Sequence, residues 1–463
     1  MGTQSKRIAF HTLGCKLNFS ETATISRDFT DHGFEKVDYR DKADIYVLNT
    51  CSVTENADKE ARKLIRQAKR RNPNSSLAII GCYAQLKPKD IANIEGVDLV
   101  LGSEEKFNVL NHLSSQETNG LTKVIHSDID HVHVFTPSYS SEERTRSFLK
   151  IQDGCDYSCS FCTVPLARGE NRSNSIANTM KKAREVAETN AKEIVLTGVN
   201  IGDFGKGSKE TFYGLIQQLD TLGGIDRIRI SSIEPNLLTD QIIEFCAQSE
   251  KFMPHFHLPL QSGSNKILKK MKRRYERDHY EDRVKKIKSD VPNACIGADV
   301  IVGFPGETEG DFLETYNFLN ELNISYLHVF TYSVRSNTGA VEMGERVSKE
   351  TKKDRSKMLH ILSDKKRRYF HDQFINKNRP VLFENMKNGK IVGHTDNYIK
   401  VQVEGGTNLV NTIQSVMMKE NHTSLVRGVL NENCFMVLFM LTGLERKNWR
   451  GGYLFTLKPR CTL

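Results

Sequence analysis

Three closely spaced cysteines carry the most specific chemistry in this sequence. Cys155, Cys159 and Cys162 stand in the run DGCDYSCSFCTVP, with the pattern C-x3-C-x2-C, directly after an expected strand. Three thiolates need a fourth ligand to complete a tetrahedral zinc site. They can instead hold three irons of a 4Fe–4S cube and leave the fourth iron open, where it can chelate the amino and carboxylate groups of S-adenosylmethionine. The pattern favours the iron–sulfur site; a zinc site and a coincidental group of cysteines are the alternatives.

Three further cysteines lie far apart in the sequence, and each follows an expected strand. Cys15 comes after RIAFHTLG, Cys51 after IYVLNT and Cys82 after LAIIG. The carboxyl ends of parallel strands lie along one edge of a sheet, so these thiols are expected to converge into a second cluster of three. The alternative is that they are buried cysteines of a small-residue core. We expect the remaining cysteines to bind no metal; they are Cys246, Cys295, Cys434 and Cys461.

The first hundred residues alternate between strand and helix signals. The expected strands are residues 7–12, 45–49, 77–81 and 98–101, and the expected helices are residues 20–32 and 55–71. Ser20 is the expected N-cap of the first helix. This alternation predicts a parallel sheet with helices on its faces. Residues 111–146 are polar and weakly patterned, which is typical of a linker.

A longer alternation follows and then gives way to a different period. The expected strands of this second part are residues 148–151, 227–232, 255–259, 296–302, 326–330 and Glu193–Thr197. About six strand–helix units predict an α/β barrel or partial barrel. Residues 349–376 read as one long basic helix, and short strands at 381–384, 390–394 and 398–403 then predict a small antiparallel β-barrel of about 55 residues.

Composition and charge limit the remaining possibilities. The chain has 463 residues, enough for several domains, and its formal net charge is +9. Basic residues gather in three runs, at residues 59–71, 266–288 and 349–377. Each run alone reads as a solvated helix face, but three together favour a polyanionic partner. No apolar run approaches the roughly 20 residues that span a bilayer, and no signal peptide is evident, so we expect a cytoplasmic protein without a membrane partner.

The cysteine motifs and their order resemble a known family. The run around Cys155 resembles the radical S-adenosylmethionine superfamily, and the whole pattern resembles its methylthiotransferase family. The matching segments are LGCKLN, NTCSVTENAD, GCYAQ, DGCDYSCSFCTVPLARGENRS, LTGVNIGDFG, SSIEPN, HLPLQSGSNKILKKMKRRY, GADVIVGFPGET and HVFTYSVRSNTGA. The resemblance implies an N-terminal domain at 4–115, a radical core at 141–372 and a TRAM-like RNA-binding barrel at 375–435. Residues 436–463 match no part of the family and have no assigned role.

The resemblance implies two 4Fe–4S clusters with different tasks. The cluster on Cys155, Cys159 and Cys162 would cleave S-adenosylmethionine reductively to a 5′-deoxyadenosyl radical. The auxiliary cluster on Cys15, Cys51 and Cys82 would carry the sulfur that a second S-adenosylmethionine methylates before its transfer. Both sets must then face one cavity. The implied partners are the anticodon stem-loop of tRNA, an electron donor and a sulfur source, the last two unidentified.

Further contacts to cofactor and substrate are expected at strand ends. Phe161 precedes the third cysteine of the loop, where an aromatic residue usually accompanies this motif. The other candidates for S-adenosylmethionine contacts are Gly198, Asn200, Glu234, Gln261, Asp299, Gly303 and Glu307. Simple strand–helix turns are the alternative for Gly198 and Asn200. Arg168 and Arg172 follow the cysteine loop and are candidate substrate contacts, with surface ion pairs as the alternative.

The first-cysteine motif also resembles one branch of the family. It reads TLGCKLNFSE, with Lys16 after the cysteine, and this is similar to enzymes that modify N6-threonylcarbamoyladenosine in tRNA. The isopentenyladenosine branch typically has Gln-Met there, and the branch acting on a ribosomal protein has Pro-Lys. The resemblance therefore implies methylthiolation at C2 of N6-threonylcarbamoyladenosine-37. The alternatives are isopentenyladenosine-37 and a non-catalytic RNA-binding protein with structural metal sites.

Overall fold

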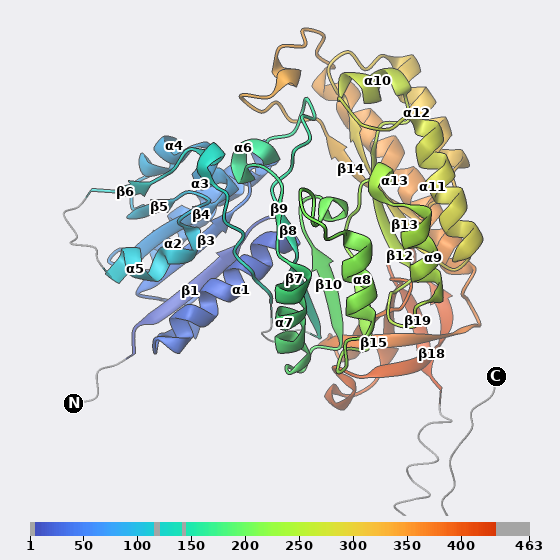
Figure 1. Cartoon of the computed structure of the whole chain (residues 1–463), viewed down its shortest axis with the longest axis horizontal. Helices are drawn as coiled ribbons and strands as arrows, with labels where there is room; N and C mark the ends of the chain where they lie inside the picture. The colour runs from blue at the N-terminus through green and yellow to red at the C-terminus, as the bar shows by residue number, and fades with distance from the viewer. Residues whose placement is uncertain (1–4, 115–120, 141–144, 432–463) are drawn as a thin grey trace, which may run out of the picture.

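The chain forms three domains that lie side by side (Figure 1). The computed structural model describes residues 5–114, 121–140 and 145–431. An α/β domain is followed by a larger domain of two parallel sheets, and a closed β-barrel follows the long helix α13. None of the described helices is both long and apolar enough to cross a membrane. Residues 436–463, the expected tail, and Cys434 with it lie outside the described residues.

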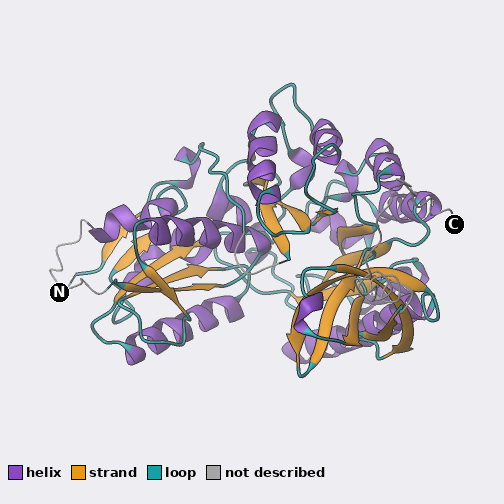
Figure 2. Ribbon diagram, turned by 90° about the horizontal axis from the view of Figure 1, so that it is seen from below, coloured by secondary structure: helices purple, strands orange, loops and turns teal. Residues whose placement is uncertain are grey.

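The N-terminal domain is a six-stranded parallel sheet in the order β2-β1-β3-β4-β5-β6. Helices cover both faces of the sheet (Figure 2). Its strands are β1 (Arg7–Thr12), β2 (Glu35–Val37), β3 (Ile45–Thr50), β4 (Ser76–Gly81), β5 (Leu99–Leu101) and β6 (Lys123–Ile125). Its helices are α1 (Lys16–Asp31), α2 (Glu55–Arg71), α3 (Cys82–Leu86), α4 (Pro88–Ala92) and α5 (Val109–Ser114).

Two sequence expectations for this domain are wrong. Helix α1 begins at Lys16, and its N-cap is Cys15, not Ser20. Ser20 lies inside the helix, where its hydroxyl donates to the carbonyl of Leu17. The sheet also extends beyond residue 115, because β6 pairs with β5 inside the expected linker. That edge strand is only three residues long and two of its side chains are exposed, so it leaves little apolar pattern to detect.

The central domain contains all six expected strands as two parallel sheets. One sheet has the order β11-β10-β7 and the other β12-β13-β14. The isolated bridge between Ile228 and Phe252 connects β11 to the segment before β12. This arrangement is a partial barrel, open between β7 and β14. Its strands are β7 (Arg146–Lys150), β10 (Glu193–Thr197), β11 (Arg227–Ile230), β12 (His255–Gln261), β13 (Cys295–Val302) and β14 (Tyr326–Thr331).

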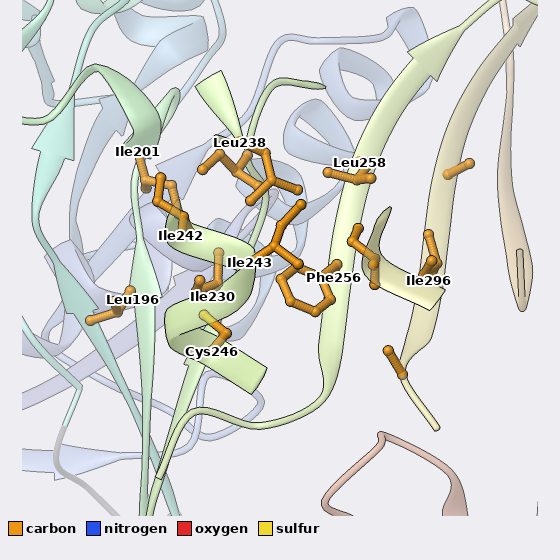
Figure 3. Close-up of a cluster of buried hydrophobic side chains, with 14 of the residues drawn as sticks. Leu196, Ile201, Ile230, Leu238, Ile242, Ile243, Cys246, Phe256, Leu258 and Ile296 are labelled. Carbon is orange, nitrogen blue, oxygen red and sulfur yellow. The ribbon is translucent and has the colours of Figure 1, made fainter. Parts of the chain in front are cut away.

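Helices pack on the outer face of these strands and complete the largest hydrophobic core (Figure 3). Several begin after a Ser or Thr whose side chain accepts a backbone N–H, as Ser175 and Thr308 do. The outer helices are α7 (Ile176–Ala187), α8 (Phe212–Asp220), α9 (Asp240–Gln248), α11 (Arg277–Asp290), α12 (Glu309–Glu321) and α13 (Lys349–Asp372). Cys246 is buried in this core on α9, as its helical pattern predicts.

The inner face of the strands is charged. Ile194, Leu196, Ile228 and Ile230 pack in the outer core, so the residues that alternate with them point into the barrel. The inward side of the six strands carries nine charged or histidine residues: Arg146, Lys150, Glu193, Arg227, Arg229, His255, His257, Asp299 and His328. An interior of this kind is built for polar ligands and chemistry more than for packing.

The closed C-terminal barrel lies against the amino ends of the core strands. Its strand order is β15-β16-β17-β19-β18, and β17 pairs with β19 in parallel, so the barrel is not wholly antiparallel as expected. Arg227 donates to the carbonyls of Pro380 and His394 at 2.9 and 3.1 Å. The barrel therefore closes one end of the core. Its strands are β15 (Asn378–Lys387), β16 (Lys390–Thr395), β17 (Lys400–Glu404), β18 (Ile413–Asn421) and β19 (Val426–Leu430).

Candidate functional site

The first three cysteines lie at one edge of the N-terminal sheet. Cys15, Cys51 and Cys82 follow β1, β3 and β4, which are adjacent strands. A Cβ added to Gly14 would be 3.0 Å from Cys51 Sγ, so the Cys15 turn lies directly against Cys51. Burial, together with the nearby Cys82 and Cys15 thiols, raises the pKa of the Cys51 thiol to about 12. The structure thus brings together three thiols that the sequence separates by more than thirty residues each.

Asn18 and Gly81 shape the turns that carry these thiols. The Asn18 amide donates to the carbonyls of Leu13 and Thr50 at 2.8 and 3.1 Å, and so ties the two turns together. Gly81 has φ +93°, and a side chain there would meet Asn49 Oδ1 at 2.4 Å. Only glycine fits that position. The sequence analysis did not identify Asn18 as a site residue. Its position three residues after Cys15, within the motif LGCKLN, is the signal that could have identified it.

The second three cysteines occupy the loop between β8 (Gln152–Asp153) and α6 (Val164–Arg168). The backbone N–H groups of Tyr157 and Val164 lie 3.4 Å from the sulfurs of Cys155 and Cys162, respectively. Arg273 Nη1 donates to Cys159 Sγ at 3.2 Å. Each sulfur therefore has one N–H donor directed at it, which favours its thiolate form. Arg273 is a site residue that the sequence analysis did not identify, because it lies more than a hundred residues from the loop.

The donor sets suit iron–sulfur clusters. Burial raises the pKa of Cys155 to about 11 and that of Cys162 to about 12. Thiols of this kind are protonated without a metal and lose their protons when they bind one. Each set offers three sulfurs, and no disulfide links any of the described cysteines. Three thiolate ligands leave one iron of a 4Fe–4S cube free to take another ligand.

The two cysteine sets face a shared boundary between domains. Helix α3, which begins at Cys82, packs against α6, which follows Cys162. Ser103 Oγ donates to the Ala167 carbonyl at 2.6 Å across the same boundary. A cavity of about 200 Å³ lies beside Cys162 and is also lined by Val53, two residues after Cys51. Its lining joins residues next to Cys51 with residues of the second loop and of β12 to β14: Val53, Thr54, Phe161, Cys162, Thr163, Val164, Gln261, Asp299, Ile301, Phe330, Thr331, Tyr332 and Ser333.

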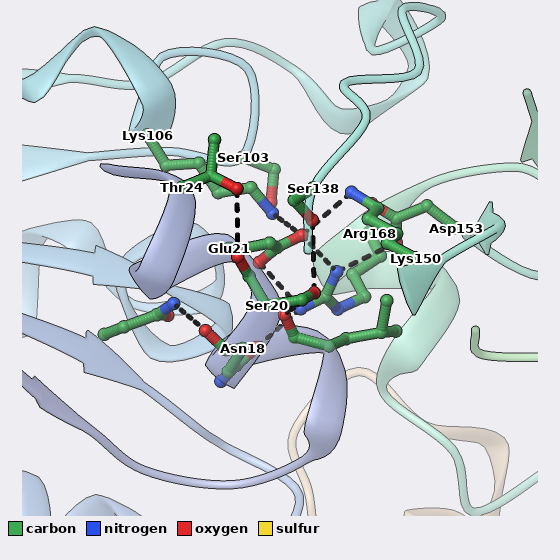
Figure 4. A network of polar contacts seen from close by, with 12 residues as sticks. Asn18, Ser20, Glu21, Thr24, Ser103, Lys106, Ser138, Lys150, Asp153 and Arg168 are labelled. Atoms are coloured by element: carbon green, nitrogen blue, oxygen red, sulfur yellow. Dashed lines mark hydrogen bonds and ion pairs between the residues drawn. The ribbon is translucent and has the colours of Figure 1, made fainter. Parts of the chain in front are cut away.

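A buried ionic network holds this boundary together (Figure 4). Arg168 Nη1 lies 3.1 Å from Glu21 Oε1 and 2.9 Å from Asp153 Oδ1. Lys106 and Lys150 approach the same Glu21 oxygen at 2.7 and 2.9 Å. Burial alone would raise the pKa of Glu21, but Arg168, Lys106 and Lys150 hold it well below its usual range. The carboxylates and cations at this domain boundary thus form ion pairs with one another and are little exposed to water.

The two arginines expected to contact substrate are already engaged. Arg168 is 3 % exposed, and besides its carboxylate partners it donates to Asn18 Oδ1 at 2.6 Å. Arg172 donates to the carbonyls of Val134, Arg168 and Glu170 and lies 3.4 Å from Asp153. Both side chains stabilise the domain boundary and the cysteine loop, and neither lines the described cavities. The structure is closer to the alternative for Arg168 and Arg172, in which they form ion pairs, except that these ion pairs are buried and not on the surface.

The candidate cofactor contacts divide into three groups. Phe161, Gln261 and Asp299 line the cavity beside Cys162. Glu234 pairs with Arg273, which reaches Cys159, and the Asn200 side chain donates to Asp203 at 2.8 Å. The others hold turns: a Cβ on Gly198 would meet Ile201 at 2.7 Å, and Glu307 accepts from the Gly303 N–H and pairs with Arg355.

A second cavity of about 400 Å³ opens between the core strands, α13 and the β-barrel. It is rich in histidine, and its lining is Lys16, Ser231, His255, His257, Cys295, Ser325, Tyr326, His328, Arg367, Phe370, His371, His394, Tyr398, Lys400 and Ser424. His257 and His328 lie 2.9 and 3.2 Å from Asp299 Oδ1. Asp299 lines the first cavity, so this triad forms a wall common to both. Strand alternation could have placed the two histidines inside the barrel.

Comparisons with known proteins agree with this architecture. Residues 7–102 match a family described as "Uncharacterized protein family UPF0004", and residues 149–319 match the radical SAM superfamily. The chain is 40 % identical over 442 residues to the threonylcarbamoyladenosine tRNA methylthiotransferase MtaB of Bacillus subtilis, covering 92 % of this chain and 97 % of that protein. It is 39 % identical to the protein of that name from Aquifex aeolicus, covering 86 % of this chain and 97 % of the relative.

Two further comparisons show weaker similarity. A tRNA-2-methylthio-N(6)-dimethylallyladenosine synthase of Clostridium perfringens is 33 % identical, over 88 % of this chain and 93 % of the relative. Among solved structures, the radical S-adenosylmethionine methyltransferase TsrM from Kitasatospora setae superposes with a TM-score of 0.53. That alignment covers 73 % of this chain and 77 % of TsrM at 13 % identity, so it supports the fold alone.

Proposed function

Because the chain belongs to the methylthiotransferase family of radical S-adenosylmethionine enzymes, we propose that it adds a methylthio group to C2 of N6-threonylcarbamoyladenosine-37 in tRNA. The observation that carries this proposal is the similarity to methylthiotransferases of that name along nearly the whole length of both chains. The site supports it, because two sets of three thiols adjoin one domain boundary, and the cavity beside Cys162 is also lined by Val53, two residues after Cys51.

The cysteines divide between two clusters in this proposal. Cys155, Cys159 and Cys162 hold the 4Fe–4S cluster that binds S-adenosylmethionine, and Cys15, Cys51 and Cys82 hold the second. When bound, these groups supply the radical that activates the C–H bond and the sulfur that replaces its hydrogen. The protein supplies position and shelter, which is the usual division of work with such cofactors.

The residues around the second loop orient its sulfurs and limit access of water. Arg273 is fixed by Glu234 and by the Tyr275 hydroxyl, so its N–H stays directed at Cys159. Phe161 and Ile301 give the neighbouring cavity an apolar wall, while Gln261 and Asp299 supply its polar groups. This combination suits a cofactor that carries both an apolar chain and polar ends.

The tRNA is proposed to approach along the β-barrel. Four of the residues that line the larger cavity belong to the barrel: His394, Tyr398, Lys400 and Ser424. A bound RNA would thus have its backbone on the barrel and a nucleoside directed into the core. Exposed lysines on β15 and β18, such as Lys387 and Lys419, are available to bind phosphate groups.

The direct test uses anaerobically reconstituted enzyme and three RNA substrates. Anticodon stem-loops that carry N6-threonylcarbamoyladenosine, N6-isopentenyladenosine or plain adenosine are incubated with S-adenosylmethionine, a reductant and sulfide, and digested for mass spectrometry. We expect the added methylthio mass on the threonylcarbamoyl nucleoside. Modification of the isopentenyl nucleoside alone would refute the substrate assignment and leave the family assignment intact.

A further inference from the structure

Within the part of the chain that the structure describes, Lys16 is a half-buried cation that lines the larger cavity without a carboxylate partner, whereas the unpaired Lys400 of the barrel is exposed. Lys16 is the first residue of α1, directly after Cys15, and it lines the larger cavity together with Ser231, His255 and Tyr326. Among the described residues no hydrogen bond or ion pair engages its ammonium group. The N-terminal domain therefore inserts one positive charge into the open side of the core barrel.

The neighbouring charges leave this cation in excess. Arg146 and Arg229 are close enough to repel Lys16, and each has its own carboxylate: Arg146 pairs with Glu384 at 2.9 Å, and Arg229 with Glu193 at 2.9 Å. Lys16, Arg146 and Arg229 thus have two carboxylates, Glu384 and Glu193, among them. Partly buried charge is costly without a counter-charge, so the cavity favours an anionic ligand group.

The shape of the cavity restricts where such a group comes from. The triad of His257, Asp299 and His328 separates this cavity from the one beside Cys162. A nucleoside whose base reaches the cysteine sets would have substituents near this wall. Arg168 and Arg172 do not compete for an anion there, because carboxylates and carbonyls already engage them.

We propose that the Lys16 ammonium group binds the carboxylate of the threonylcarbamoyl substituent and thereby selects this nucleoside. The inference rests on the proposed function and adds the residue that recognises the substrate. A threonylcarbamoyl group carries a carboxylate and a hydroxyl, whereas an isopentenyl group is wholly apolar and gains nothing from a cation. A charged side chain left unpaired by the wrong substrate discriminates strongly, because its desolvation is not compensated.

An RNA phosphate is the other anion that could reach Lys16, and the experiment separates the two. Three stem-loops of one sequence carry N6-threonylcarbamoyladenosine, its methyl ester or N6-isopentenyladenosine. Their dissociation constants are measured by fluorescence anisotropy with reconstituted wild-type enzyme and with Lys16→Gln, Lys16→Arg and Lys400→Gln. Lys400 is the matched control, because it lines the same cavity from the barrel. Iron content is measured for every variant.

Wild-type enzyme is expected to bind the free carboxylate about tenfold to a hundredfold more tightly than the methyl ester, as for a charge-assisted hydrogen bond. Lys16→Gln should abolish this preference while affinity for the ester changes little, and Lys16→Arg should retain it. Lys400→Gln should weaken all three RNAs alike. Turnover of the threonylcarbamoyl stem-loop should also fall in Lys16→Gln, the variant that loses the preference for the free carboxylate.

Several results would overturn the inference. Equal binding of acid and ester by wild-type enzyme would do so without any variant, even if Lys16→Gln loses iron. Equal weakening of all three RNAs by Lys16→Gln would assign the lysine to phosphate, and loss of the preference in Lys400→Gln would assign the carboxylate to the barrel. If wild-type enzyme does not methylthiolate the threonylcarbamoyl stem-loop at all, the proposed function fails and not this interaction alone.

Discussion

Glu21 of α1 and Arg168 of α6 form a buried ion pair, with 3.1 Å between Oε1 and Nη1, although 147 residues separate them in the sequence. Glu21 is 0 % exposed and Arg168 is 3 % exposed. Cys15 is the N-cap of α1, and Cys162 lies two residues before α6. The pair therefore fixes the position of one cysteine set relative to the other.

Replacing Glu21 with Gln should destabilise the protein strongly. The change leaves Arg168, Lys106 and Lys150 facing an uncharged amide in a buried site, and loss of one partner from such a pair costs about 3–5 kcal/mol. Urea unfolding measures the effect. The matched control is Glu55→Gln, which removes an exposed ion pair with Lys59 and should have a much smaller effect on the free energy of unfolding. Equal losses in the two variants would contradict the importance of the buried network.

The free energy of unfolding should fall as the pH is lowered, because buried carboxylates such as Glu193 become protonated. Burial alone would raise the pKa of Glu193, but Arg229 and Arg146 lower it to about 2, from an ordinary value of 4.5. A group whose pKa is lower in the folded state stabilises the fold above its unfolded pKa, and this contribution is lost as the pH falls toward the folded value. Urea midpoints measured from about pH 6 down to about pH 3 should decline, and less steeply in Glu193→Gln. An identical slope in that variant would refute the assignment.

The two cysteine sets should lose iron independently. Replacing Cys15, Cys51 and Cys82 with Ala should reduce the reconstituted protein from about eight irons to about four. Such a variant should still form 5′-deoxyadenosine from S-adenosylmethionine but transfer no methylthio group. Cys246→Ala is the control, since that thiol is buried in the hydrophobic core and should not affect iron content. A triple variant that still held about eight irons would show that these cysteines are not ligands.

The barrel should contribute to RNA binding through exposed cations. Replacing both Lys387 and Lys419 with Gln should weaken tRNA binding and reduce the slope of log K against log salt by about 0.7–0.9 for each phosphate that is no longer neutralised. Lys42→Gln is the control, because Lys42 is exposed and lies before β3, at the opposite edge of its sheet from the cysteines. Loss of affinity without a change in slope would mean that these lysines do not bind phosphate.

The sequence predicts the strands of the core well, and the partners of its charges poorly. Glu193–Thr197 and the other five core strands are short segments that carry apolar residues between turn signals, and all six form. The start of α1 was misplaced because the helix has no side-chain cap, so the usual Ser signal pointed to Ser20 instead. Arg168 could not be recognised as buried, since its partner Glu21 belongs to another domain and only the folded chain brings them together.

The closure of one end of the core by the β-barrel has a consequence for protein engineering. Arg227 and Arg229 donate to the carbonyls of Pro380, His394 and Asp396, and Arg146 pairs with Glu384. Truncating the chain after α13, or replacing the barrel with a foreign RNA-binding module, would leave these guanidinium groups without acceptors. It would also expose the interior of the core to solvent at the amino ends of its strands. The barrel therefore cannot be replaced as an independent unit. A chimera that directs the enzyme to another RNA must keep acceptors at the positions of Pro380, Glu384, His394 and Asp396.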